Sequence, residues 1–140
     1  MFDGLIAALW DTRVDPQSID PETVFFLSSN ILSLQDSIIS FKEAGKSVLV
    51  DIDFISGIQG DEFGLRYLTK LGVDGFITNR LRTYKQARSL GKPCVLRFFA
   101  LDSRAVERGL SQIASNKVCC VEVLPGLAAV SYTHLRAHET

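Results

Sequence analysis

The stretch "PCVLRFFALDSRAVERGL", residues 93–110, joins an apolar run to a helical segment through two small polar residues. Residues 93–101 are short, rich in β-formers and bounded by a proline and polar residues, which indicates a buried strand. Asp102 or Ser103 can cap the helix that follows. The stretch therefore predicts one strand-and-helix unit of a parallel sheet, with a single charged side chain, Arg97, inside the strand.

Five further runs of this kind lie elsewhere in the chain, with helix-like segments in most of the gaps. They are "GLIAAL" (4–9), "TVFFLSS" (23–29), "SVLVDID" (47–53), "GFITN" (75–79) and "CVEVLPG" (120–126). The gaps carry helix signals, with Asn30 as a cap and Gly45 and Gly72 as helix ends. Only the first gap is different, because Pro16 and Pro21 leave room for one short helical turn at most. This alternation is typical of a parallel sheet.

Six such strands are compatible with an open doubly wound sheet or with part of a (β/α)8 barrel. The first strand is followed by no glycine-rich phosphate loop, which weakens the doubly wound alternative. Several strands end in polar residues, where a barrel collects its functional groups. These residues are Asp11, Asp53, Asn79 and Asp102. We therefore predict an α/β fold, an incomplete TIM-barrel-like (β/α) repeat of about six parallel strands with intervening helices.

Composition describes one globular domain without a global attraction to nucleic acid. The chain has 140 residues, of which 46% are hydrophobic and 22% charged, and its net charge is -1. RNA binding would therefore need a local basic patch. The apolar start is too short to span a bilayer and lacks the base of a signal peptide, so we expect a cytoplasmic protein that does not enter membranes. Cys94, Cys119 and Cys120 form no CxxC pair, and neither a metal site nor a disulfide is predicted.

The last ten residues, "SYTHLRAHET", differ abruptly in composition from the strand-like run before them. They resemble translated sequencing-adapter DNA, which recurs at the ends of truncated reading frames. We therefore predict a truncated barrel domain over 1–129 and a non-native tail over 130–140, either disordered or artefactual.

Three charged side chains are expected to point to the inside of the sheet. Alternation along the strands places Asp51, Arg97 and Glu122 on inward faces, so that they meet. A buried guanidinium needs carboxylates or an anionic ligand as partners. We predict that this cluster binds a ligand, with Asp53 contacting ligand hydroxyls. The alternative is an internal salt-bridge network that only closes the barrel floor.

The "LPG" turn after Glu122 is a weaker candidate for the same site. Pro125 and Gly126 end a predicted parallel strand, where exposed backbone amides can approach an anion. Ordinary turn chemistry explains the two residues equally well.

The segment "NRLRTYKQARSLGK", residues 79–92, holds a local excess of positive charge and no acid. We predict that it contacts RNA, with basic side chains on phosphates and a tyrosine stacked on an unpaired base. The predicted residues are Arg80, Arg82, Tyr84, Lys85, Arg88 and Lys92. The alternative is a solvated helix surface.

Four motifs taken together carry a family resemblance over about residues 3–127. "EAGKSVLVDID", "GVDGFITN", "RFFALDS" and "VEVLPG" resemble the glycerol-3-phosphate responsive antiterminator family, the GlpP proteins. The resemblance implies an atypical barrel with glycerol 3-phosphate as effector and the leader mRNA of glycerol-utilisation operons as partner, so that transcription passes a terminator. The family motifs fall on residues 50–53, on Arg97, Phe99, Asp102 and Ser103, and on Glu122, Pro125 and Gly126. The family usually has histidine at the position of Asp51.

An enzyme, or a binding protein acting on a small phosphorylated metabolite, is the competing class, with Asp51 and Glu122 as an acid and base pair. Before the tail, however, the sequence has no nucleophile beside a histidine, no metal cluster and no cofactor loop. We therefore predict a regulatory RNA-binding protein without a cofactor. Homo-oligomer formation is left open.

Overall fold

The computed structural model describes residues 5–99, 102–118, 120–124 and 128–131. Within these ranges, six parallel strands form a curved sheet that an antiparallel strand extends, in the spatial order β1-β2-β4-β6-β7-β8-β9. The strands are β1 (Ile6–Leu9), β2 (Thr23–Phe26), β4 (Ser47–Asp51), β6 (Gly75–Thr78), β7 (Cys94–Phe99), β8 (Cys120–Leu124) and the antiparallel β9 (Ala128–Ser131). The predicted α/β fold, an incomplete barrel of about six parallel strands, is confirmed.

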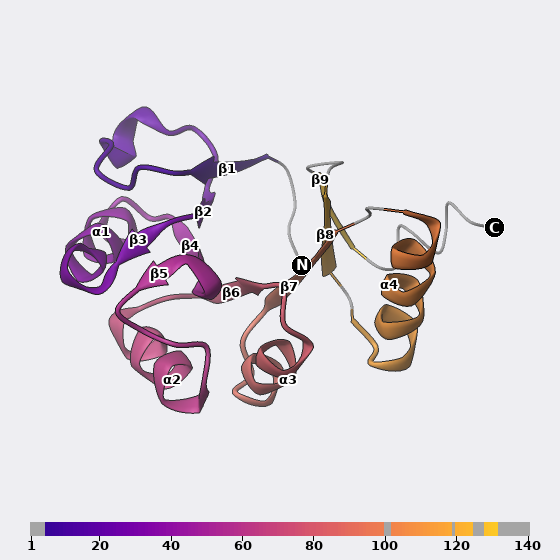
Figure 1. Ribbon diagram of the computed structural model, residues 1–140. Coiled ribbons are helices and arrows are strands. Elements are labelled where there is room, and N and C mark those ends of the chain that lie inside the picture. Colours follow the sequence, from indigo (N-terminus) through magenta and orange to yellow (C-terminus); the bar gives the residue numbers. More distant parts are fainter. Residues whose placement is uncertain (1–4, 100–101, 119, 125–127, 132–140) are drawn as a thin grey trace.

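Four α-helices in the described residues connect these strands. They are α1 (Ile31–Glu43), α2 (Glu62–Leu71), α3 (Leu81–Ser89) and α4 (Ser103–Ser115). Figure 1 shows the strands as an arch with the helices on its outer side. Among the connections between the parallel strands, the one from β1 to β2 holds the short turn η1 (Pro16–Ser18) in place of an α-helix, as its prolines predicted. All six strands point the same way, so their carboxyl ends meet along one rim of the arch.

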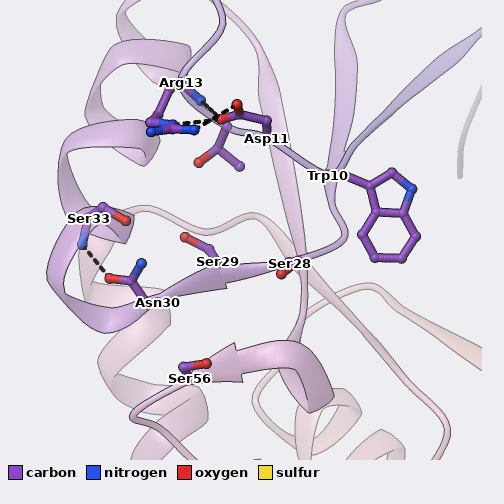
Figure 2. A pocket seen from close by; sticks show the side chains of 9 residues that line it. Trp10, Asp11, Arg13, Ser28, Ser29, Asn30, Ser33 and Ser56 are labelled. Carbon is purple, nitrogen blue, oxygen red and sulfur yellow. Dashed lines mark hydrogen bonds and ion pairs between the residues drawn. The ribbon is translucent and has the colours of Figure 1, made fainter.

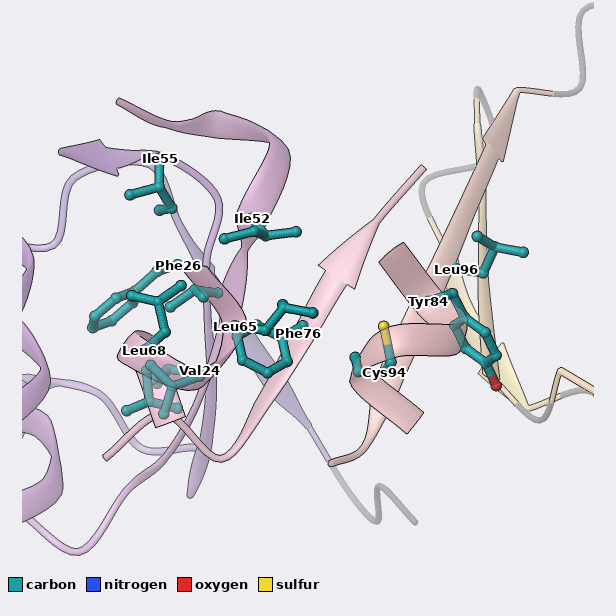
Figure 3. Packing of buried hydrophobic residues seen from close by; sticks show 14 of the residues in the cluster. Val24, Phe26, Ile52, Ile55, Leu65, Leu68, Phe76, Tyr84, Cys94 and Leu96 are labelled. Carbon is teal, nitrogen blue, oxygen red and sulfur yellow. The ribbon is translucent and has the colours of Figure 1, made fainter. Parts of the chain in front are cut away.

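The outer face of the sheet carries the main hydrophobic core. Val24 and Phe26 of β2 and Val48 and Val50 of β4 are fully buried. The Phe26 ring packs edge-to-face against Phe41 of α1, with 5.1 Å between the ring centroids. Figure 3 shows how side chains from strands and helices fill this layer. The alternation of strand residues therefore sends one apolar set under the helices.

The inner face carries a second, smaller apolar layer. Its buried members are Phe25, Leu49, Ile77, Val95 and Cys120. Each lies one residue away from an outward-facing neighbour, as the two-residue period of a strand requires. This layer is the floor beneath the charged residues described below.

The helix caps follow the predicted polar residues with one refinement. The Asn30 carboxamide oxygen accepts hydrogen bonds from the backbone N–H groups of Leu32 and Ser33. Gly72 ends α2 in the left-handed region, with φ of 107°. Between the two predicted caps of α4, the structure selects Asp102, which accepts from Ala105 N at 2.8 Å, while Ser103 is the first helical residue.

Three short features were not predicted, and the antiparallel strand β9 is one of them. β3 (Ser29–Asn30) pairs with β5 (Ile55–Ser56) beyond the ends of β2 and β4. A short helical turn, η2 (Ile52–Phe54), follows β4 directly.

The predicted tail boundary at residue 130 falls within β9, and residues 132–140 lie outside the described residues, so the division into domain and tail stays a prediction. In the described residues, no helix has the length and apolar character needed to cross a membrane.

Candidate functional site

Arg97, Asp51 and Glu122 meet on the inner face as predicted, and we call them the arginine cluster. Arg97 Nη1 donates to Asp51 Oδ2 at 2.5 Å, and Arg97 Nε donates to Glu122 Oε1. The register of the sheet places Arg97 of β7 directly beside Glu122 of β8. Asp51 is fully buried and Arg97 nearly so, whereas the Glu122 side chain is 15% exposed. The role of the three in ligand binding stays a prediction.

A cavity of about 370 Å³ lies over this cluster, and we call it the mouth cavity. Its lining residues are Ala8, Trp10, Leu27, Phe54, Arg97, Phe99 and Glu122. The Phe54 ring centroid is 5.9 Å from Arg97 Cζ, so the guanidinium has an aromatic face on one side. Apolar walls around a few convergent polar groups are typical of a small-molecule site.

The arginine cluster has more acidic than basic groups, because the single cation Arg97 pairs with two carboxylates. Burial raises the pKa of Asp51 to about 6, although the neighbouring guanidinium acts in the opposite direction. Burial also acts to lower the pKa of Arg97, but its hydrogen bonds to Glu122 and Asp51 outweigh burial and raise it. The guanidinium therefore stays charged. The cluster carries a net charge of -1 with both acids ionised and of zero once Asp51 is protonated.

Asp53 does not join the arginine cluster. β4 ends at Asp51, whose carboxylate accepts from Asp53 N and so caps η2, which breaks the alternation assumed from the sequence. The Asp53 carboxylate instead accepts from Thr78 Oγ1 at 3.0 Å and from Asn79 N at 2.7 Å. Asp53 therefore holds the junction between β6 and α3. Pro125 and Gly126 lie outside the described residues.

The predicted RNA-binding segment forms α3 and its flanks. Arg80, Arg82, Lys85 and Arg88 are exposed, and we call these four the basic face. Lys92 is half-buried, and its carbonyl accepts a long hydrogen bond from Arg88 Nη1 at 3.5 Å.

The predicted stacking role of Tyr84 is wrong for this conformation. Tyr84 is only 2% exposed and packs in the outer core near Leu96 and Cys94 (Figure 3). The reason is helical geometry: α3 lies on the sheet through Tyr84 and Ala87, and its charged residues occupy the opposite face.

A second cavity, of about 570 Å³, was missed from the sequence, and we call it the serine pocket. It is lined by residues 10–13 after β1 and 28–30 after β2, together with Ser33 and Ser56 (Figure 2). The signal was present in "WDTR" and "SSN", two polar segments that each follow a strand. Carboxyl ends of neighbouring parallel strands lie side by side, which is why these segments meet.

No arrangement that could hold a metal ion is formed by three or more His, Cys, Asp or Glu side chains in the part of the chain that the structure describes.

Two solved structures resemble this chain over most of its length. A glycerol uptake operon antiterminator-related protein from Thermotoga maritima MSB8 is 48% identical, with a TM-score of 0.84, and the match covers 90% of this chain and 73% of that protein. A glycerol uptake operon antiterminator regulatory protein from Listeria monocytogenes str. 4b F2365 is 26% identical, with a TM-score of 0.77, and the match covers 86% and 67% of the two chains.

Sequence comparison agrees with these structures. The protein YgcP of Escherichia coli (strain K12) is 30% identical over 125 residues, which are 87% of this chain and 65% of that protein. This chain therefore spans slightly less than two thirds of the length of its curated relative. The sequence profile of the glycerol-3-phosphate responsive antiterminators matches residues 5–140, including the segment 130–140 whose assignment as a tail stays a prediction. The chain belongs to the glycerol-3-phosphate responsive antiterminator family.

Proposed function

We propose that this chain is part of a cytoplasmic regulator that binds glycerol 3-phosphate and the leader mRNA of glycerol-utilisation operons, so that transcription passes a terminator. Membership of the antiterminator family supports a regulatory role. In the proposed mechanism, glycerol 3-phosphate prefers the RNA-competent conformation and raises its population. The effector needs no cofactor in this scheme.

The single observation that carries the effector site is the arginine cluster beneath the mouth cavity. A salt-bridge network that only closed the barrel floor would need no space above it, whereas here Arg97 and Glu122 both line a cavity of about 370 Å³. Glu122 is partly exposed, and its carboxylate can accept hydrogen bonds from ligand hydroxyls. Asp51 is fully buried and orients Arg97 from below. We assign the polyol end of the effector to this cluster.

The basic face is the proposed contact for leader RNA. Arg82, Lys85 and Arg88 follow a three-residue spacing on α3, and all three side chains are exposed. Basic side chains on one helix face can neutralise successive phosphates. Because Tyr84 is buried, the proposed contact is to the RNA backbone rather than by base stacking.

The test is retention of leader RNA by the protein with and without glycerol 3-phosphate. The double variant Arg82→Glu and Arg88→Glu should reduce retention at least tenfold, because two phosphate contacts become repulsive. The matched control is Arg104→Glu with Arg108→Glu, two exposed arginines on α4 that should leave retention unchanged. Equal retention by both double variants would remove α3 from the interface. Equal retention with and without the effector would refute the sensing role.

The enzyme alternative rests on Asp51 and Glu122 as an acid and base pair in a barrel. Both carboxylates already accept hydrogen bonds from Arg97, which suits binding better than proton transfer. We propose binding without turnover. Prolonged incubation with the protein should leave the phosphorus NMR resonance of glycerol 3-phosphate unchanged, and a new resonance would favour the enzyme.

The formation of a homo-oligomer stays a prediction that sedimentation can test.

A further inference from the structure

The arginine cluster is poorly suited to the phosphoryl end of the proposed effector. Arg97 already donates through Nε and Nη1 to two carboxylates, and the cluster has a net charge of -1 or zero. A phosphoryl group near neutral pH carries close to two negative charges. Such a group would be repelled by Glu122, or at best not attracted, whereas a hydroxyl group can donate to it.

The serine pocket lies directly beside the mouth cavity. Trp10 lines both cavities, and the consecutive residues Leu27 and Ser28 line one each. The two cavities therefore adjoin at Trp10 and at the carboxyl end of β2. Figure 2 shows the Trp10 indole on one side of the serine pocket and the Arg13, Ser29 and Asn30 side chains on the other. The proposal below requires one small ligand to reach from one cavity into the other past Trp10.

The serine pocket offers donors that have no other task in the described structure. Ser29 Oγ is buried and has no hydrogen-bond partner among the described residues. A buried hydroxyl without a partner is costly, which is why such groups usually mark a place for a ligand or water. The Asn30 carboxamide oxygen is used by the backbone of α1, and its amide nitrogen, which only donates, remains on the pocket side (Figure 2).

The serine pocket holds one carboxylate for its one cation, whereas the arginine cluster holds two. Arg13 donates through Nε and Nη2 to Asp11 at 3.0 and 3.1 Å, so the pair is neutral and Nη1 is not engaged by Asp11. The Arg13 side chain is 84% exposed and has room to turn toward a ligand. The first turn of α1 contains no acidic residue that would repel an anion.

We propose that the serine pocket holds the phosphoryl group of the effector through Ser29, Asn30 and Arg13, while Glu122 and Arg97 hold its hydroxyl groups. This division of the ligand rests on the proposed function, because it takes the effector to be a small polyol phosphate. It places the phosphoryl group at the ends of β1 and β2, within the described chain.

Trp10, the single tryptophan of the chain, gives the test a direct readout. Its fluorescence should change when glycerol 3-phosphate or inorganic phosphate is titrated into the 140-residue protein. Ser29→Ala and Arg13→Gln should each weaken the binding of both ligands about tenfold or more, since each removes a hydrogen bond to a charged group. Asp11→Asn should tighten both, because it frees the Arg13 guanidinium. Ser111→Ala, an exposed serine on α4, is the matched control that should change nothing.

Glu122→Gln separates the two assignments by the sign of its effect. The variant should weaken the binding of glycerol 3-phosphate and leave the binding of inorganic phosphate unchanged. If the phosphoryl group lay in the mouth cavity instead, this variant would remove a repelling charge and tighten both ligands.

The inference is overturned if wild-type protein binds glycerol 3-phosphate and Ser29→Ala and Arg13→Gln bind it equally well, an outcome that leaves the proposed function intact. Absence of glycerol 3-phosphate binding to the wild-type protein, checked by calorimetry, would overturn both proposals. Circular dichroism shows whether each variant is folded.

Discussion

The two faces of the same sheet are built for different tasks. On the outer face, Val24, Phe26, Val48 and Val50 are fully buried beneath helices, and charged residues are kept away from them. On the inner face, the apolar layer is thin, and the arginine cluster lies only two residues further along the same strands. Exposed aromatic side chains surround that cluster, and Trp10 is 72% exposed. Strand alternation thus separates residues that stabilise the fold from residues available to a ligand.

Removing outer-face packing should give the largest loss of stability. Phe41→Ala deletes a fully buried ring that packs on Phe26, and we expect a loss of about 3–5 kcal/mol in the free energy of unfolding. Leu32→Ala, on the same helix but 91% exposed, should change it by less than about 0.5 kcal/mol. Chemical denaturation measures both. Similar losses for the two variants would contradict the assignment of stability to the outer face.

Removing the cation of the inner face should lower the free energy of unfolding somewhat less than the loss of outer-face packing does. Arg97→Met leaves Asp51 and Glu122 close together without a counter-charge, and we expect a loss of about 3 kcal/mol near neutral pH. The loss should shrink on acidification, because protonated carboxyls no longer need the guanidinium. Arg97→Lys keeps the charge and should recover part of the stability. An Arg97→Met protein as stable as wild type would mean that the cluster is dispensable to the fold.

The smallest effect should be a pH dependence that belongs to the inner face alone. The pKa of Asp51 is about 6 in the folded protein and 3.8 without its environment, so the folded state binds more protons between these values. The stability that this group contributes is therefore present at low pH and is lost as the pH rises through about 6.

Asp51→Asn removes this titration. Relative to the variant, wild-type protein should lose on the order of 1 kcal/mol of unfolding free energy between pH 5 and pH 7. Phe41→Ala should keep the wild-type pH dependence and serves as the control from the outer face. Parallel curves for wild type and Asp51→Asn would show that Asp51 does not titrate in this range.

Much of the fold was predictable because short-range signals act independently of the rest of the chain. The apolar runs marked the six parallel strands, and Asn30 and Gly72 marked helix ends through their own hydrogen bonds and backbone conformation. The two-residue period of a strand was enough to bring Asp51, Arg97 and Glu122 together. The period failed at Asp53, because Asp51 ends its strand by capping η2.

Tyr84 and the serine pocket show where local signals were insufficient. The sequence indicates that α3 has an apolar and a basic side. Whether Tyr84 is buried or exposed depends on how the helix lies on β6 and β7. Likewise, "WDTR" and "SSN" are ordinary polar segments until parallel pairing of β1 and β2 sets them side by side.

By itself, the sequence determined the six parallel strands, the helix ends and the alternation that put one cation between two acids, because each depends on residues a few positions apart. Only the tertiary structure decided which polar segments share a cavity, which tyrosine is buried and where a second group of donors lies. Those properties depend on contacts between residues distant in the chain, and the curvature of the sheet creates them.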